Sequence, residues 1–178
     1  MRFKSALCLL LAVCFLAASS LPVFAENDAP AQPSTLEELL ANLPEDEEVF
    51  QAELSRLGIV CTSHEMPQQD VLTRASVVDG PITGLAISGG VAICSGDVVG
   101  DSSTTDVVIY LYLKKFENGN FEKKYSNHKT FTGRYGYYEY SRSLSTYGSG
   151  PYRVDGSYYL FTGGKYINPE INSSVVYY

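Results

Sequence analysis

All fourteen tyrosines of this chain lie between Tyr110 and Tyr178, and the chain contains no tryptophan. Tyrosine is enriched in strands, where its ring packs on a pleated, half-buried surface. The same region holds the clearest strand pattern, because residues 107–114 carry Val, Ile, Leu and Leu at their odd positions. This period of two predicts a strand whose odd positions face a core. The C-terminal part of the chain is therefore expected to form a β domain in which tyrosine supplies the aromatic packing.

Short β-prone runs separated by turn residues continue through this region. The Asn118-Gly119 pair predicts a hairpin, and the lysine-bearing run that follows it suits an edge strand. Asp155-Gly156 leaves two alternatives open, a hairpin turn or a glycine inside one continuous strand. The predicted strands cover 71–76, 82–88, 91–95, 107–114, 121–131, 137–146, 152–162 and 171–178. Seven or eight such strands predict a mainly β fold, an antiparallel β-sandwich with immunoglobulin-like or jelly-roll-like topology.

The N-terminus has the three parts of a secretion signal. Arg2 and Lys4 precede an apolar run over residues 6–18, and the small residues before position 26 suit cleavage after Ala25. The run is shorter than the roughly 20 residues that span a bilayer, and no membrane span is expected in the mature chain. We therefore expect residues 1–25 to be a signal peptide and the protein to be secreted and extracellular.

Residues 26–68 form an acidic leader with two predicted short helices. Ser34 and Glu37 match a capping box, Pro44 opens the second helix, and Gly58 suits its C-terminal end. Because short helices are marginal in water, this prefix is expected to be solvated or weakly docked. The alternative is a prosegment or a partner-binding helix pair. Residues 69–178 form the tyrosine-rich β-sandwich domain.

The negative charge of the protein is concentrated in the prefix. Residues 26–70 contain eleven acidic side chains and a single basic one, Arg56, whereas residues 71–178 contain nine acidic and ten basic side chains. A net charge of −7 without a basic stripe argues against nucleic acid or an anionic membrane as a partner.

Two cysteines, Cys61 and Cys94, remain after removal of the signal peptide. In an oxidising compartment the simplest expectation is one disulfide between them. The alternative is a nucleophilic Cys61 with His64 as its base, which requires Cys94 to stay unpaired.

The usual catalytic patterns do not occur in this sequence. Its two histidines, His64 and His128, lie outside any nucleophile or metal-ligand motif. Asp97, Asp101 and Asp106 flank a polar loop, but their spacing does not match an EF-hand, and solvated loop acids are the simpler interpretation. We expect no catalytic residues, no metal and no cofactor.

Tyrosines clustered near glycines are the candidate ligand-binding residues: Tyr135, Tyr137, Tyr138, Tyr140 and Tyr147. Flat rings on a surface of small residues can stack on sugars or on a protein partner. Strand alternation predicts that Tyr138 and Tyr140 share one face with Leu144 and belong to the core. Tyr135 and Tyr147 lie next to glycines in predicted turns and are expected to be exposed.

A family resemblance rests on two segments of the β region. Residues 109–115 (IYLYLKK), followed by Asn118-Gly119, and residues 151–154 (PYRV), followed by a Gly-rich turn, resemble an uncharacterised family of small exported proteins of Gram-positive bacteria, a domain of unknown function. The resemblance covers the C-terminal part of the chain. It implies export and a β fold, and it assigns no functional residue.

These observations predict a secreted, noncatalytic β-sandwich protein that binds a cell-surface polysaccharide or an extracellular protein through a tyrosine patch. One alternative is a secreted effector or inhibitor that acts through the acidic helical prefix. The other is a small hydrolase that uses Cys61 or scattered carboxylates.

Overall fold

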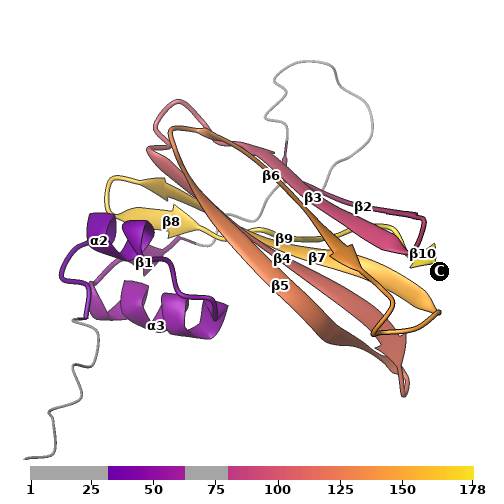
Figure 1. Cartoon of the computed structure of the whole chain (residues 1–178). Coiled ribbons are helices and arrows are strands. Elements are labelled where there is room, and N and C mark those ends of the chain that lie inside the picture. Colours follow the sequence, from indigo (N-terminus) through magenta and orange to yellow (C-terminus); the bar gives the residue numbers. More distant parts are fainter. Residues whose placement is uncertain (1–31, 63–79) are drawn as a thin grey trace, which may run out of the picture. The chain divides into compact units, whose positions relative to one another are not determined.

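The computed structural model describes residues 32–62 and 80–178 (Figure 1). The expected signal peptide, the predicted strand at 71–76 and His64 lie outside the described residues. Residues 33–178 belong to one compact unit.

Two β-sheets build this unit. The three-stranded sheet, called sheet B, has the order β2-β3-β6 and contains β2 (Ile82–Ser88), β3 (Val91–Val99) and β6 (Tyr135–Ser143). The seven-stranded sheet, called sheet A, is built around β5-β4-β7, where β4 is Asp106–Glu117, β5 is Asn120–Thr132 and β7 is Pro151–Thr162. Shorter strands complete sheet A beside β7: β8 (Lys165–Ile167), β9 (Glu170–Asn172), β10 (Val176–Tyr177), and β1 (Val60–Cys61) parallel to β8.

The connections between the sheets have immunoglobulin-like topology. The chain passes from sheet B to sheet A after β3, returns after β5 and crosses again after β6. At this last corner the Tyr152 hydroxyl donates a hydrogen bond to the carbonyl of Gly148, four residues upstream. A tyrosine near the start of this strand that bonds back to the preceding corner is typical of immunoglobulin-like sandwiches. Of the two predicted topologies, the immunoglobulin-like one is confirmed.

The core between the sheets follows the predicted alternation. The odd positions of β4 from 107 to 113 are fully buried against β3 and β7. Tyr158 of β7 also enters this core, where its hydroxyl donates to the Ile82 carbonyl at 2.7 Å and lies 2.7 Å from the Thr83 hydroxyl. A Cβ on Gly156 would lie 2.5 Å from Thr83 Oγ1 and 2.7 Å from the Tyr158 ring. Gly156 therefore makes room for the ring, and it lies inside one continuous strand, which resolves the Asp155-Gly156 alternative.

A second core covers the outer face of sheet A. Two helices, α2 (Leu36–Ala41) and α3 (Glu47–Arg56), lie against this face (Figure 1). Phe50 is fully buried among aromatic rings, with its centroid 5.0 Å from that of Tyr159 and 5.8 Å from that of Tyr110. Leu39 and Leu54 are buried beside it. The expectation of a solvated or weakly docked prefix was wrong, because Val108 and Tyr110, at even positions of β4, pack in one core with the buried side chains of both helices.

Some element boundaries also differ from the predictions. The first helix is capped one residue later than expected, by Thr35, whose hydroxyl accepts from the Glu38 backbone N–H at 3.2 Å. Strand β3 continues to Val99, through residues that were predicted to be a loop. The predicted last strand is instead the series of short strands β9 and β10, because each of them pairs with a different part of β7.

Candidate functional site

Two exposed tyrosines lie on the outer face of sheet B. In β6 the even positions from 136 to 140 point toward the core and the odd positions point outward. Tyr135 and Tyr137 are consequently 55% and 47% exposed. No element among the described residues packs over this face, whereas the helices cover the outer face of sheet A. We call the outward-facing residues of β2, β3 and β6 the tyrosine face.

Carboxylates accompany these rings. Asp97 lies directly opposite Tyr137 on the neighbouring strand, and Glu139 follows Tyr137 on the same face. The Tyr137 hydroxyl donates to Glu139 Oε2 at 2.7 Å, and this hydrogen bond is the main reason why the pKa of Tyr137 is raised. Oδ1 of Asp97 is buried and has no hydrogen-bond partner among the described residues. The half-buried Asp97 carboxylate at the centre of the tyrosine face therefore has one oxygen below the surface that is unpaired within the described part of the chain.

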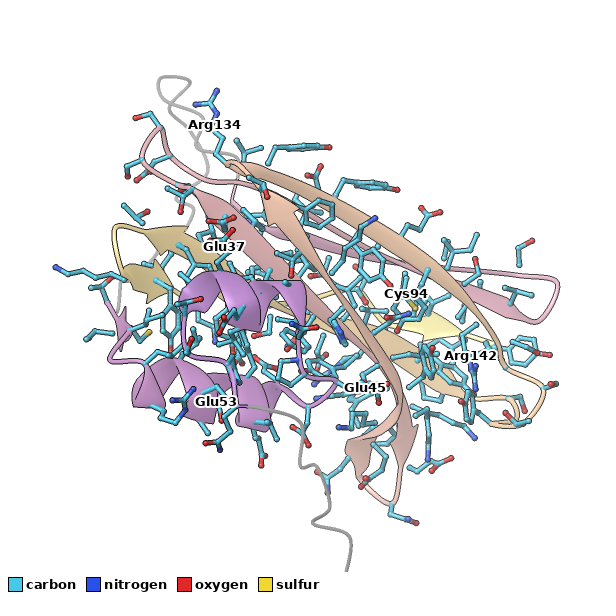
Figure 2. The ribbon with its side chains drawn as sticks, turned by 60° about the vertical axis from the view of Figure 1, so that its left-hand side comes forward. Glu37, Glu45, Glu53, Cys94, Arg134 and Arg142 are labelled. Carbon is cyan, nitrogen blue, oxygen red and sulfur yellow. The ribbon has the colours of Figure 1, made fainter. Side chains whose placement is uncertain are left out.

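The arginine within β6 points away from the tyrosine face. Arg142 is at an even position, and its guanidinium stacks 4.3 Å from the centroid of the Tyr125 ring and donates to the Tyr147 hydroxyl at 3.3 Å. Arg134 projects outward from the corner between β5 and β6 (Figure 2). The tyrosine face therefore combines two rings and two carboxylates with no opposing cation from β6.

The other candidate tyrosines do not join this face. Tyr140 is 9% exposed and Tyr138 is half-buried, and both pack into the core between the sheets, as their alternation predicted. Tyr147 was expected to be exposed but is half-buried at the corner before β7, where its carbonyl accepts from Lys115 Nζ at 2.6 Å. The predicted five-tyrosine patch is thus reduced to Tyr135 and Tyr137.

The predicted disulfide does not form. Cys94 is fully buried between the two sheets (Figure 2), whereas Cys61 is exposed at the far edge of sheet A, and both thiols are free. The two side chains belong to different layers, since the register of β1 places Cys61 opposite Tyr166, which packs in the helix-covered core. Burial raises the pKa of the Cys94 thiol to about 11.

The structure places the remaining polar candidates in local contacts. His128 packs beside the Tyr110 ring at 5.1 Å between centroids, and burial lowers its pKa. Asp101 accepts hydrogen bonds from the backbone N–H and hydroxyl of Ser103, which lower its pKa. Within residues 32–62 and 80–178, no three His, Cys, Asp or Glu side chains gather in a way that could hold a metal ion. The same part of the chain contains no helix long and apolar enough to cross a membrane.

Sequence reasoning missed a carboxylate at the junction of the helices and sheet A. Glu47, in the first turn of α3, accepts hydrogen bonds from the hydroxyls of Tyr112, Ser157 and Tyr159, the last at 2.6 Å. Burial, followed by the hydrogen bond to Glu47, raises the pKa values of Tyr112 and Tyr159. A cleft of about 390 Å³ opens beside this cluster. The register of β4 and β7 places these hydroxyls side by side, and no short sequence motif encodes that arrangement.

Comparisons with known proteins assign no family. No family model matches the chain, and no curated protein matches it. Among solved structures, CsgH from R. palustris is 13% identical with a TM-score of 0.31, over 53% of this chain and 87% of that one. OgpA from Akkermansia muciniphila is 10% identical with a TM-score of 0.33, and the match spans 55% of this chain and only 29% of that protein.

Proposed function

We propose that this protein is a secreted, noncatalytic binding module that holds a polysaccharide on its tyrosine face. The observation that carries the proposal is the exposure of Tyr135 and Tyr137 together on one face of an edge strand. Residues two apart in a strand are separated by roughly 7 Å, so an extended ligand that lies along β6 can contact both rings.

The composition of the face favours a sugar polymer. Aromatic rings offer flat apolar surfaces for the C–H faces of sugars, and carboxylates accept hydrogen bonds from sugar hydroxyls. The face also carries small residues, which leave room for a chain molecule, beside the exposed apolar side chains of Ile82 and Val91: Gly84, Ala86, Ser95 and Ser141. Cores of protein–protein interfaces are depleted of serine and of acidic residues. The serines and carboxylates of this face therefore favour a hydroxyl-rich ligand, whereas Ile82 and Val91 are the part that a protein partner would contact.

The docked helices weaken the case for an effector that acts through its prefix. Leu39, Phe50 and Leu54, the buried apolar residues of α2 and α3, pack against sheet A, and Glu47 accepts hydrogen bonds from hydroxyl donors of the same chain. These contacts support a structural role for residues 33–62.

The test is binding of the mature chain, residues 26–178, to bacterial cell walls and to a panel of polysaccharides, by co-sedimentation and affinity electrophoresis. Changing both Tyr135 and Tyr137 to alanine is expected to weaken binding by more than about tenfold, because truncating a central aromatic contact costs about 2 kcal/mol or more. Tyr177→Ala is the matched control, since Tyr177 is 78% exposed but belongs to β10 of sheet A.

Thermal unfolding must first show that all variants are folded. A folded wild type that binds none of the polymers, or a double variant that binds as well as the wild type, would show that the tyrosine face is not a polysaccharide site.

A further inference from the structure

The charge of the tyrosine face selects among polysaccharides, and this inference rests on the proposed function. The outward positions of β2, β3 and β6 include the acidic residues Asp97 and Glu139 and no lysine or arginine. Arg142 is turned toward the Tyr125 ring. A face with this balance repels uronic-acid or phosphate-bearing polymers and attracts cationic ones.

Asp97 places a negative charge at the centre of the tyrosine face. It is the middle member of a row across the sheet, between Ile82 of β2 and Tyr137 of β6. Its Oδ1 is buried and has no partner among the described residues, and the hydroxyl of Tyr137, its cross-strand neighbour, donates to Glu139. Because Oδ1 is buried, a ligand can reach only the exposed part of this half-buried carboxylate. The negative charge of Asp97 there favours a ligand that brings a strong, positively charged donor.

We infer that the ligand is an amine-bearing saccharide, a polymer of amino sugars whose amino groups are free and protonated. An ammonium group forms charge-assisted hydrogen bonds with carboxylates, and it is also attracted to the faces of tyrosine rings. Asp97 and Tyr137 present both kinds of group side by side on neighbouring strands. An N-acetylated sugar has no such charge and would use the rings alone.

The experiment compares hexamers of glucosamine with hexamers of N-acetylglucosamine, which differ in the charge of the nitrogen substituent, by isothermal titration calorimetry on the mature chain. The glucosamine form is expected to bind about three- to tenfold more tightly, and added salt should reduce this difference. Asp97→Asn and Glu139→Gln should each remove most of the preference while leaving binding of the acetylated form unchanged. Glu139 is exposed, so its variant tests the idea even if Asp97→Asn impairs folding. Glu48→Gln, which removes an exposed charge from α3, is the matched control.

The possible outcomes distinguish the amine preference from the proposed binding of polysaccharides by the tyrosine face. Equal binding of both hexamers, unaffected by either face variant, overturns the amine preference and leaves the polysaccharide module standing. If Glu48→Gln lowers the preference for glucosamine and Asp97→Asn does not, the cation site lies on the acidic prefix. That result would overturn the inference. If neither hexamer binds but uncharged polymers of the panel do, the amine preference is also refuted. If no saccharide binds at all, both the amine preference and the polysaccharide module are refuted.

Discussion

Replacing Phe50 with alanine tests whether the acidic prefix is an integral part of the fold. The Phe50 side chain is 0% exposed and lies against the rings of Tyr110, Tyr159 and Phe161, with centroid distances of 5.8, 5.0 and 6.3 Å. Truncating a buried phenylalanine to alanine costs about 3 to 5 kcal/mol through lost burial and the cavity that remains. For a chain of this size, that loss corresponds to a melting temperature lower by roughly 6 to 20 °C.

The assay is thermal and urea unfolding of residues 26–178, followed by far-UV circular dichroism and tyrosine fluorescence. Both probes should report a single transition, because the two cores share β4, where buried Val108 of the helix-covered core adjoins buried Ile109 of the inter-sheet core. Val49→Ala, at a neighbouring position of α3 that is 50% exposed, is the matched control and should change stability by less than about 0.5 kcal/mol. If Phe50→Ala lost less than about 1 kcal/mol, or if the helices melted in a separate earlier transition, the prefix would be a loosely docked appendage and this account of the second core would be refuted.

Three further predictions follow from the core and the thiols. In the native protein a thiol reagent should modify Cys61 rapidly and Cys94 only after denaturation, since Cys94 is buried and its pKa is raised to about 11; one thiol that reacts quickly and one that is protected would confirm the free, separated pair. Gly156→Ala should destabilise the fold by about 1 to 3 kcal/mol in urea titrations, because the new Cβ would lie 2.5 Å from Thr83 Oγ1; an unchanged midpoint would contradict the tight packing. Burial raises the pKa of Tyr158 from 10.0 to about 12, so the folded state disfavours the phenolate. The stability that this tyrosine contributes is therefore complete below pH 10 and is lost as the pH rises toward 12. Tyr158→Phe should flatten the alkaline limb of a stability–pH curve.

The local sequence determined most of the long strands and the inward face of β4 and β6. The period of two in residues 107–114 predicted β4 and its inward positions, and Asn118-Gly119 predicted the hairpin to β5, in which Asn118 has a φ of 52° and Gly119 a φ of 89°. Alternation in the predicted strand likewise assigned Tyr138 and Tyr140 to the core, and the neighbouring turn glycines predicted the exposure of Tyr135. Such features depend on side-chain direction and backbone conformation within a few residues, so they can be read from the chain alone.

The candidate site was only partly predictable. Tyr135 and Tyr137 were recognised as aromatic candidates, but their isolation from Tyr147 depends on the corner between β6 and β7. The placement of Asp97 opposite Tyr137 depends on the register between β3 and β6, which joins residues forty positions apart in the chain. Strand register is set by the packing of both sheets, and no short motif in this sequence specifies it.

The sequence by itself therefore determined a tyrosine-rich β domain with an acidic helical prefix, because period and turn chemistry are local properties. Only the tertiary structure decided that the prefix is buried and that Cys61 and Cys94 stay apart. The physical reason lies in the even positions of β4: Val108 and Tyr110 are as fully buried as Ile109 and Leu111, because helices from the other end of the described chain cover them. Which element covers the second face of a sheet depends on the free energy of packing between segments distant in sequence, and this choice also left the outer face of sheet B as the surface on which Tyr135 and Tyr137 are exposed.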